Sequence, residues 1–591
     1  MKRWYKYIKP YLPYFIIGPI CMIVEVLGEI VMPKMLAFII DYGVQHKDMP
    51  PALQSLYQLL GADAPFILAI MAGMILTAVL MMLGGVGGAY FGAKASVNFA
   101  ADLREDVYRK VQRFSFSNID EFSTGSLVTR LTNDVTQLQN FVNMMLRMAL
   151  RAPGMLIGAL IMAVVLNPSL TLVLCVAMPL LLLTIGFFVS KGFPRFSVMQ
   201  EKIDSLNSTV QENLTNVRVV KSFVREDREK EKFKKANGNL KRAGMRAMMI
   251  IILMSPAMTF FMNATTIAVL WFGGNMVVGG TMTTGDLTAF VTYITQILMS
   301  LMMLTMVFMM MSRAMASGKR IAEVLDEEID ISDSHVKNSD LTVREGAVEF
   351  RDVSFRYYKN SERKVLDHIN IKIEPGSITG ILGSTGSGKT TLVSMIPRLY
   401  DCDEGQVLVD GVNVKDYSLF HLREGVGMVL QKNVLFSGTI EENLRWGDQD
   451  ATEEEIKRMS ELAQADKFVS SFTDGYQTDL DQGGTNVSGG QKQRLCIARA
   501  LLKKPKILIL DDSTSAVDTA TETLIRKSLR EELAASTKII IAQRITSVME
   551  ADQIIVMDEG CVTGIGTHEQ LLASNEEYQE IYYSQMDKKE A

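Results

Sequence analysis

The stretch GSTGSGKTT, from Gly383 to Thr391, contains residue types that bind phosphate groups. Its glycines allow backbone N–H groups to curl around phosphate oxygens at the start of a helix. Lys389 can reach the outer phosphates of a nucleotide, and the Thr390 hydroxyl can ligate Mg²⁺. The stretch follows the strand-like SITGILG and precedes the helix-like TTLVSMIPRLY, which is the context of a P-loop. The predicted phosphate-binding residues are Gly383, Ser384, Gly386, Ser387, Gly388, Lys389, Thr390 and Thr391.

Two further segments carry residues for phosphate chemistry, one at this site and one for another anion. The apolar run KILIL ends in Asp511 and is expected to be a strand that brings a carboxylate to the Mg²⁺. Before it, NVSGGQKQRLCIARALLKK opens with Ser488, Gly489 and Gly490, which can present a hydroxyl and N–H groups to an anion at a helix start. A surface acid and a plain helix cap are the alternatives, but the combination with the P-loop favours nucleotide chemistry.

These residues lie in the second half of the chain, whereas the apolar residues are concentrated in the first half. Of 591 residues, 48% are hydrophobic, and stretches with few charges run from Tyr14 to Met311, whereas the chain from Arg320 onward has the composition of a soluble α/β protein. Six segments have the roughly 20 apolar residues that a membrane span needs: about 14–40, 65–90, 142–166, 169–190, 247–274 and 285–311. We therefore predict an α-helical six-span transmembrane domain and an α/β P-loop nucleotide-binding domain, with a transmembrane part at 1–320, a linker at 321–345 and the nucleotide-binding part at 346–591.

Basic residues indicate the orientation of the spans. The connections at about 91–141 and 191–246 are long and rich in Lys and Arg, while the opposite connections have few or none. By the positive-inside rule, the long connections, both termini and the soluble half are cytoplasmic. The basic N-terminus resembles a secretory signal, but the apolar run from Tyr14 to Ile40 is too long for one and is predicted to remain as a span.

Charge and cysteine content narrow the class of protein. The formal charge of −5 gives no reason to expect nucleic acid as a partner. The five cysteines lie far apart without metal-ligand spacing, which indicates free, reduced thiols.

Two features of the spans concern a transported molecule. Glu25 and Glu29 lie four residues apart and therefore on one helical face. If they line a cavity, it would favour cations; if they pair with neighbouring spans, their role is structural, and both interpretations stay open. The Met-rich LMMLTMVFMMMS suits a promiscuous binding surface, although a Met stripe is more often packing or lipid-facing.

The combination GSTGSGKT, VSGGQ and LILDD resembles the ATP-binding cassette (ABC) transporters, in particular bacterial multidrug-type exporters of the type IV fold, in which six spans precede one cassette. The resemblance covers almost the whole chain, and VSGGQ is its most specific signal. It implies a transporter ATPase, or translocase, that uses ATP and Mg²⁺ to export hydrophobic or amphipathic compounds across the bacterial cytoplasmic membrane, in contact with its lipids. Two cassettes pair head to tail in this family, so this chain is half a transporter.

The resemblance also implies roles for single residues. Tyr357 would stack on adenine, Gln431 would sense the γ-phosphate and Mg²⁺, and the SAVD loop from Ser515 to Asp518 would cross between cassettes. The segments FSTGSLVTRLTNDV and ENLTNVRVVKSF would form the intracellular loops whose tips couple the cassettes to the spans. The residues that complete the partner's ATP site would be Ser488, Gly489, Gly490 and Gln491.

Two positions depart from the family pattern at the hydrolytic centre. Competent members have glutamate where this chain has Asp512 and a switch histidine where it has Gln543; the loop TDLDQGGTN also lacks the usual glutamate and arginine. Asp512 draws its carboxylate back by one methylene, about 1.5 Å, and a misplacement of about 1 Å can cost roughly 10²-fold in rate. Gln543 can hydrogen-bond a phosphate oxygen but cannot become a cation.

We therefore expect a cassette that binds ATP well and hydrolyses it slowly through Asp512, Gln543 and Gln431. It would be the weak subunit of a heterodimer whose other half-transporter has the glutamate and the histidine. A homodimer with two slow sites is the alternative, followed by an ATP-gated channel or sensor. We expect the transported substrate to be a small hydrophobic molecule.

Overall fold

The computed structural model describes residues 2–47, 54, 57–58, 63–336, 339–358, 363–512 and 517–586. The chain folds into two compact units. The first contains Met1–Lys110 and Gly125–Asp326, and the second contains Val111–Thr124 and Glu327–Ala591. A short segment from the first third of the chain therefore belongs to the same unit as the C-terminal half.

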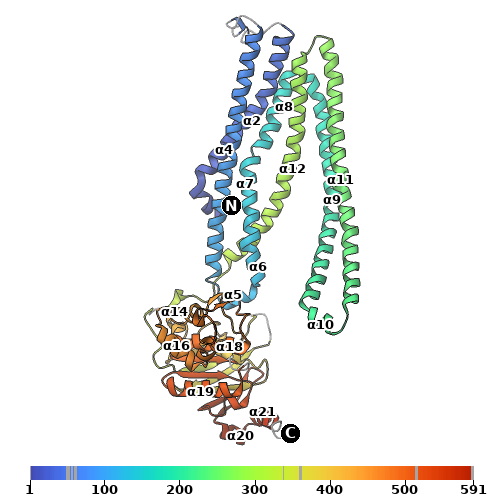
Figure 1. The fold of residues 1–591 in the computed structure, drawn as a ribbon. Coiled ribbons are helices and arrows are strands. Elements are labelled where there is room, and N and C mark those ends of the chain that lie inside the picture. Colours follow the sequence, from blue (N-terminus) through green and yellow to red (C-terminus); the bar gives the residue numbers. More distant parts are fainter. Residues whose placement is uncertain are drawn as a thin grey trace. The chain divides into compact units, whose positions relative to one another are not determined.

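The first unit consists of long helices (Figure 1). Within the described residues, six helical segments are long and apolar enough to cross a membrane, which confirms the predicted six spans: Arg3–Val44, Asp63–Val111, Thr124–Leu166, Pro168–Thr215, Glu226–Val278 and Thr284–Asp326. The helices are α1 (Lys2–Ile8), α2 (Leu12–Phe38), α4 (Asp63–Val111), α6 (Thr124–Thr129), α7 (Val135–Met148), α8 (Arg151–Leu166), α9 (Pro168–Thr215), α10 (Val217–Ser222), α11 (Glu226–Val278) and α12 (Thr284–Asp326).

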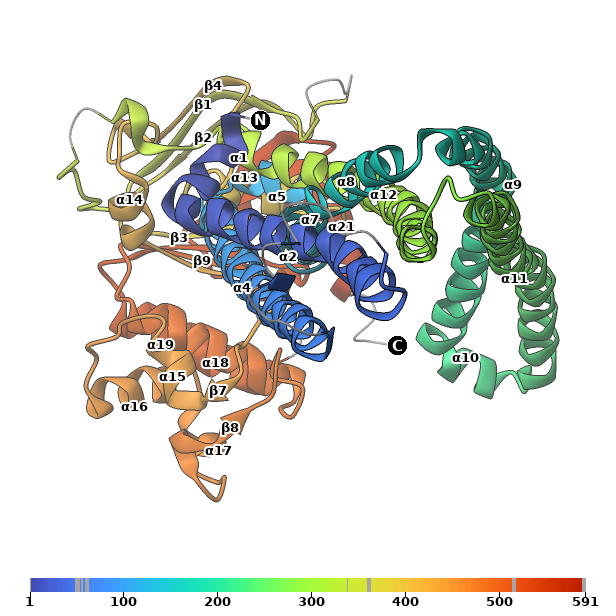
Figure 2. The same ribbon diagram turned by 90° about the horizontal axis from the view of Figure 1, so that it is seen from above.

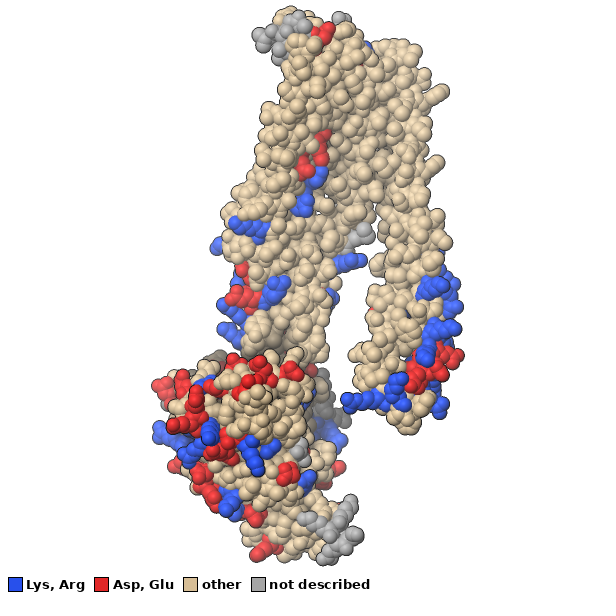
Figure 3. Space-filling view, viewed as in Figure 1, with Lys and Arg blue, Asp and Glu red and all other residues tan. Residues whose placement is uncertain are grey.

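Helices α9 and α11 pair along their length and are joined through α10 (Figures 1 and 2). At 1.5 Å per residue, the 53 residues of α11 measure about 80 Å, against a hydrocarbon core of about 30 Å. More than half of the helix therefore extends beyond the bilayer core. The charged side chains of the pair gather at its α10 end (Figure 3), which identifies that end as the one in water.

The sixth span packs against the first at two places. Tyr293 is fully buried, and its hydroxyl donates to the Ile30 carbonyl at 2.7 Å. Where the first span ends in a π-helical turn, the buried Asp41 carboxylate accepts from the Thr283 hydroxyl at 2.6 Å and from the Gly285 N–H at 2.8 Å. These bonds fix the start of α12 on the end of the first span.

The second unit contains a six-stranded sheet with the order β12-β11-β3-β10-β9-β6, a four-stranded antiparallel sheet with the order β2-β1-β4-β5, and the pair β7-β8. The strands are β1 (Val348–Phe355), β2 (Leu366–Ile373), β3 (Ile378–Gly383), β4 (Glu404–Val409), β5 (Val412–Asn413), β6 (Val426–Val429), β7 (Gly438–Thr439), β8 (Asp479–Leu480), β9 (Ile507–Asp511), β10 (Thr537–Ile541), β11 (Gln553–Asp558) and β12 (Cys561–Gly566). The helices are α5 (Phe116–Glu121), α13 (Lys389–Ser394), α14 (Leu419–Gly425), α15 (Ile440–Leu444), α16 (Glu453–Leu462), α17 (Asp466–Val469), α18 (Gly489–Leu502), α19 (Thr519–Glu532), α20 (His568–Ser574) and α21 (Glu576–Met586).

The central strands β9 and β10 are buried at every residue, as expected for parallel strands that are covered on both faces. Strand β10 pairs in parallel with both β3 and β9, so that Ile541 lies opposite Ile381 on one side and Asp511 on the other. The carboxyl ends of these three strands therefore meet at one edge of the sheet, where open α/β sheets bind ligands.

Candidate functional site

A cavity of about 320 Å³ lies at this edge of the sheet. The structure brings eleven of the predicted site residues together in its wall: Tyr357, Gly383, Gly386, Gly388, Lys389, Thr390, Thr391, Gln431, Asp511, Asp512 and Gln543. The remaining predicted P-loop residues, Ser384 and Ser387, contact Lys389 directly.

The loop between β3 and α13 is curled around the Lys389 side chain. Its ammonium donates to the carbonyls of Gly383 (3.0 Å) and Ser384 (2.6 Å) and to the Ser387 hydroxyl (3.2 Å). Gly388 has a φ of 94° and precedes the first helical residue, a conformation that favours glycine. Burial lowers the pKa of Lys389, although the two neighbouring aspartates oppose that shift. A positive charge is thus held at the start of a helix, where phosphate groups bind.

Asp511 and Thr390 form the part of the site that fits Mg²⁺. The Thr390 hydroxyl lies 2.9 and 3.1 Å from the two carboxylate oxygens of Asp511. Asp511 is almost fully buried, and burial raises its pKa because the charged form lacks solvation. A buried carboxylate, a hydroxyl and the nearby Gln431 amide are hard oxygen ligands of the kind that Mg²⁺ prefers, so these residues fit the ion.

Asp512 and Gln543 contact each other at the same edge. The Gln543 amide Nε2 donates to Asp512 Oδ2 at 2.8 Å. Burial raises the pKa of Asp512, while hydrogen bonds with Gln431 and Gln543 act in the opposite direction. The two positions that depart from the family pattern are therefore direct partners.

Tyr357 lies at the rim of the cavity with its ring partly exposed. Its hydroxyl is 2.8 Å from the Thr391 hydroxyl, and its ring makes T-shaped contacts with the rings of Phe355 and Tyr400. Tyr400 was not predicted as a site residue from the sequence. Its hydroxyl donates to Asp120 of α5 at 2.8 Å. The only signal for it was its place at the end of TTLVSMIPRLY, and nothing in the sequence connects it with Asp120.

The predicted signature residues lie apart from this cavity within the chain. Ser488 caps α18, accepting from the Gln491 N–H at 3.3 Å and donating its own N–H to Gln491 Oε1 at 2.9 Å. Gly489 and Gly490 form the first turn of that helix. Asp518 caps α19 by accepting from the Thr521 N–H at 2.9 Å, while Ser515 and Ala516 of the predicted crossing loop are outside the described residues.

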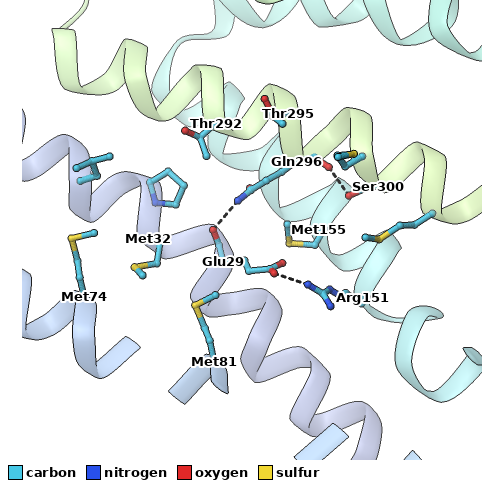
Figure 4. Close-up of a pocket in the computed structure, with 14 residues that line it drawn as sticks. Glu29, Met32, Met74, Met81, Arg151, Met155, Thr292, Thr295, Gln296 and Ser300 are labelled. Atoms are coloured by element: carbon cyan, nitrogen blue, oxygen red, sulfur yellow. Dashed lines mark hydrogen bonds and ion pairs between the residues drawn. The ribbon is translucent and has the colours of Figure 1, made fainter. Parts of the chain in front are cut away.

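A second cavity, of about 500 Å³, lies between the helices of the first unit (Figure 4). Glu29 and Arg151 line it and form an ion pair at 2.6 Å, and Arg151 also pairs with Glu25 at 3.1 Å. The Gln296 amide donates to the Glu29 carbonyl at 3.0 Å. Three hydroxyl side chains, Thr292, Thr295 and Ser300, also line the cavity. The rest of the wall consists of Pro33, Leu36 and six methionines: Met32, Met74, Met81, Met155, Met299 and Met303. Both interpretations of the acids hold in part, because Glu29 lines a cavity and is also paired with a neighbouring span.

In the part of the chain that the structure describes, six apolar helices and a P-loop unit define a membrane protein that binds nucleotide. A family model described as ABC transporter transmembrane region matches residues 15–301, and one described as ABC transporter matches residues 366–515. The chain is 37% identical over 585 residues to the uncharacterized ABC transporter ATP-binding protein YfiB of Bacillus subtilis (strain 168), covering 99% of this chain and 98% of that protein. It belongs to the ABC transporters, as a half-transporter of the exporter type.

Two other matches are a second relative and a solved structure with the same fold. A fatty acid ABC transporter ATP-binding/permease protein of Mycobacterium tuberculosis (strain CDC 1551 / Oshkosh) is 36% identical over 479 residues, which are 81% of this chain and 75% of that protein. A structure of a bacterial Atm1-family ABC exporter with ATP bound has the same fold, with a TM-score of 0.76 and 24% identity over 97% of this chain and 98% of that one. The chain is thus a multi-pass membrane protein with a cytoplasmic ABC domain that supports transporter ATPase activity, and half-transporters of this family dimerise.

Proposed function

We propose that this chain exports hydrophobic or amphipathic compounds from the cytoplasm as the hydrolytically weak subunit of a heterodimer, with both termini in the cytoplasm. The other subunit would be a related half-transporter with glutamate and histidine at the positions of Asp512 and Gln543. The observation that carries the proposal is the 2.8 Å hydrogen bond from Gln543 to Asp512. Asp512 is one methylene shorter than glutamate, so it activates the attacking water less well. The Gln543 amide cannot become a cation, so it stabilises the charge that develops on the phosphate less well than histidine.

The same cassette retains the groups that bind ATP. Lys389 and the N–H groups of the P-loop would hold the phosphates, and the exposed face of Tyr357 would stack on adenine. Thr390, Asp511 and Gln431 would hold Mg²⁺, which supplies positive charge to the phosphate oxygens when it is bound. Binding without efficient hydrolysis follows from these two sets of residues.

The signature segment would complete the partner's ATP site. It lies at the exposed start of α18, where helix N–H groups attract anions, and outside the cavity that contains this chain's own P-loop. Each chain would therefore contribute to two sites, one through its P-loop and one through Ser488, Gly489, Gly490, Gln491 and Asp518.

Exposed apolar side chains on both units support pairing with a second subunit. At the α10 end of the long helix pair, Phe223 and Val224 are 71% and 78% exposed. On the nucleotide-binding unit, the exposed rings of Phe436 and Trp446 stack with centroids 4.3 Å apart. Apolar patches of this kind mark protein interfaces. We expect the α10 end of one subunit to contact the nucleotide-binding unit of the other.

The cavity between the spans supports the proposed substrate class. Its volume is within the range of about 300–1,000 Å³ of small-molecule sites, and its methionines can adapt to different apolar shapes. Glu29 and Arg151 would face the polar end of an amphipathic compound. The relative named as a fatty acid transporter would carry a molecule of the same general kind.

The test is the ATPase activity of the full-length chain in lipid nanodiscs, alone and co-purified with the half-transporter that has the glutamate and histidine. We expect very low turnover alone and restored turnover in the complex. In the complex, Ser488→Arg in this chain should remove most of the activity, because Ser488 would serve the competent site, while Lys389→Ala should reduce it far less. Equal effects of the two substitutions, or robust turnover by the chain alone, would refute the asymmetry and support a homodimer.

Transport in inside-out vesicles tests the direction and type of movement. ATP-dependent accumulation of a hydrophobic dye is expected from the complex and not from a complex with both P-loop lysines replaced. Ion conductance gated by ATP, without accumulation of any compound, would instead support a channel or sensor.

A further inference from the structure

Three aromatic rings form a closed cluster beside the nucleotide cavity. Tyr357 contacts Phe355 with centroids 5.1 Å apart and Tyr400 at 5.3 Å, and Phe355 contacts Tyr400 at 5.5 Å. The two contacts of Tyr357 are edge-to-face, with interplanar angles of 79° and 87°, which is a favourable geometry for aromatic pairs. Tyr400 therefore helps to fix the plane of the ring that would face adenine.

The other end of Tyr357 is fixed as well. Its hydroxyl is 2.8 Å from the hydroxyl of Thr391, which lies in α13 directly after the P-loop. With the hydroxyl and two ring contacts in place, the surface of Tyr357 that lines the cavity is the part left for a ligand. A ligand that stacks on this face would restrict the whole aromatic cluster further.

Tyr400 also bonds to the segment Val111–Thr124, which arrives from the membrane half of the sequence but folds with the second unit. Its hydroxyl donates to Asp120 Oδ2 at 2.8 Å, and its ring meets the Phe116 ring with centroids 6.0 Å apart. Burial raises the pKa of Tyr400, and the bond to Asp120 raises it further, so the hydroxyl remains a donor throughout the physiological range.

Helix α5, which carries Phe116 and Asp120, is itself rigidly built. Ser115 and Asn118 form a capping box at its start. The Asn118 amide also donates to the Glu327 side chain and to the Glu328 carbonyl, both at 3.0 Å. A shift of Tyr400 would therefore move α5, a helix that is held by several hydrogen bonds.

We propose that Tyr400 is a positioning residue that links nucleotide at Tyr357 to the segment Val111–Thr124. Its ring supports the stacking surface, and its hydroxyl ties that surface to Asp120. Nucleotide on Tyr357 strengthens the hold of the cassette on α5, and by linkage a well-held α5 strengthens nucleotide binding by the same factor. A single hydrogen bond to a charged group supports a coupling of about fivefold or more. This inference rests on the proposed nucleotide site at Lys389 and Tyr357.

The two roles of Tyr400 can be separated by substitution in the full-length chain in nanodiscs. The measurements are the Kd of ATP and the ATP-induced change in amide hydrogen exchange of residues 116–121. Tyr400→Phe keeps the ring but removes the bond to Asp120, so we expect the Kd of ATP to rise about fivefold and most of the ATP-induced protection to be lost. Tyr400→Ala removes ring and hydroxyl, and we expect the Kd to rise about tenfold or more.

Two further variants are controls. Asp120→Ala should reproduce Tyr400→Phe, and the double variant should show no additional effect, because both remove one bond. Tyr358→Phe removes a hydroxyl from the neighbouring tyrosine, which is 71% exposed, and should leave both measurements unchanged.

Unchanged ATP-induced protection in Tyr400→Phe would overturn the proposal, as would a loss of affinity in Tyr400→Phe equal to that in Tyr400→Ala. The two possible failures are distinguishable by Lys389→Ala. If ATP still binds when Lys389 is replaced, the proposed nucleotide site is wrong; if binding depends on Lys389 but Tyr400→Phe behaves as wild type, only the link through Tyr400 is wrong.

Discussion

The substitution Asp512→Glu would lengthen the expected catalytic carboxylate by one methylene, about 1.5 Å. A misplacement of about 1 Å can cost about 10²-fold in rate, which corresponds to about 2.7 kcal/mol of barrier. We therefore expect Asp512→Glu to raise kcat of the isolated chain by about 100-fold. KM for ATP should change less than about threefold, because Lys389, Thr390 and Asp511 are left in place.

The contact between the two departing positions predicts that their effects are not additive. Gln543 donates to Asp512 at 2.8 Å, and a hydrogen bond to a charged group contributes about 1.5–3 kcal/mol. Gln543→His alone should change kcat by less than about tenfold, because the acid remains short. Combined with Asp512→Glu, it should give the fastest variant and a coupling of more than about 0.5 kcal/mol in a double-mutant cycle.

The backbone conformation at Asp512 determines how much Asp512→Glu lowers the free energy of unfolding. Asp512 has a φ of 45°, in the left-handed region that Asp tolerates better than most residues. Asp512→Glu should therefore lower the free energy of unfolding by less than about 1 kcal/mol. Thermal unfolding of each variant checks that the gain in activity is measured on folded protein.

The assay is phosphate release by the full-length chain in nanodiscs, with the rate of Lys389→Ala subtracted. Asp450→Glu makes the same change at an exposed position and should leave the rate unchanged. A kcat for Asp512→Glu within threefold of the wild type would contradict the reasoning. So would a wild-type chain that alone turns over at about 10 s⁻¹, a typical enzyme rate.

Three further substitutions test the structure. Burial raises the pKa of Asp511, so the folded state binds the Asp511 proton more tightly than the unfolded state and loses stability as pH rises past the ordinary pKa of about 3.9. At pH 7, Asp511→Asn removes the buried charge and should raise the Tm of the nucleotide-free protein by about 2 °C. The same substitution should abolish the further stabilisation by Mg²⁺ with ATP. Gly285→Ala would place a Cβ 2.5 Å from the Asp41 carboxylate and should lower the Tm in detergent. Gly186→Ala is the control, because no atom lies within 4 Å of the Cβ that it would add. Arg151→Met would leave two acids in the span unpaired and should destabilise by about 2 kcal/mol or more, whereas Glu29→Gln should cost less by the same thermal assay.

The parts of the fold that depend on local sequence were predictable. A span needs a run of about 20 apolar residues, and the P-loop needs glycines, a lysine and a threonine at fixed spacing, so both are visible without tertiary information. The helix after the P-loop is shorter than TTLVSMIPRLY indicates, because α13 ends at Ser394 ahead of Pro397. The predicted strands at VEFRDVSFRY, INIKI and SITGILG correspond to β1, β2 and β3.

Contacts between distant segments were not predictable. Tyr400 and Asp120 are separated by 280 residues, and neither has a local pattern that points to the other. The segment Val111–Thr124 folds with the C-terminal half, although the sequence analysis placed it within the membrane domain and expected the coupling loop at Phe122 to Val135. Arg151 was also missed as the partner of Glu25 and Glu29, because an arginine at the start of a span has no helical spacing to acids in another span.

Slow hydrolysis at Asp512 and the link through Tyr400 together suggest what a slowly hydrolysing ATP site contributes to a transporter. If segment Val111–Thr124 responds to nucleotide occupancy at Tyr357, the response requires binding and not cleavage. A site with Asp512 and Gln543 would hold ATP through several cycles of the competent site and would keep α5 fixed on this cassette during that time. Restoring fast hydrolysis with Asp512→Glu and Gln543→His should then shorten the time for which residues 116–121 stay protected from amide hydrogen exchange, in proportion to the gain in turnover. Adding Tyr400→Phe to the restored variant should abolish that protection without changing its turnover.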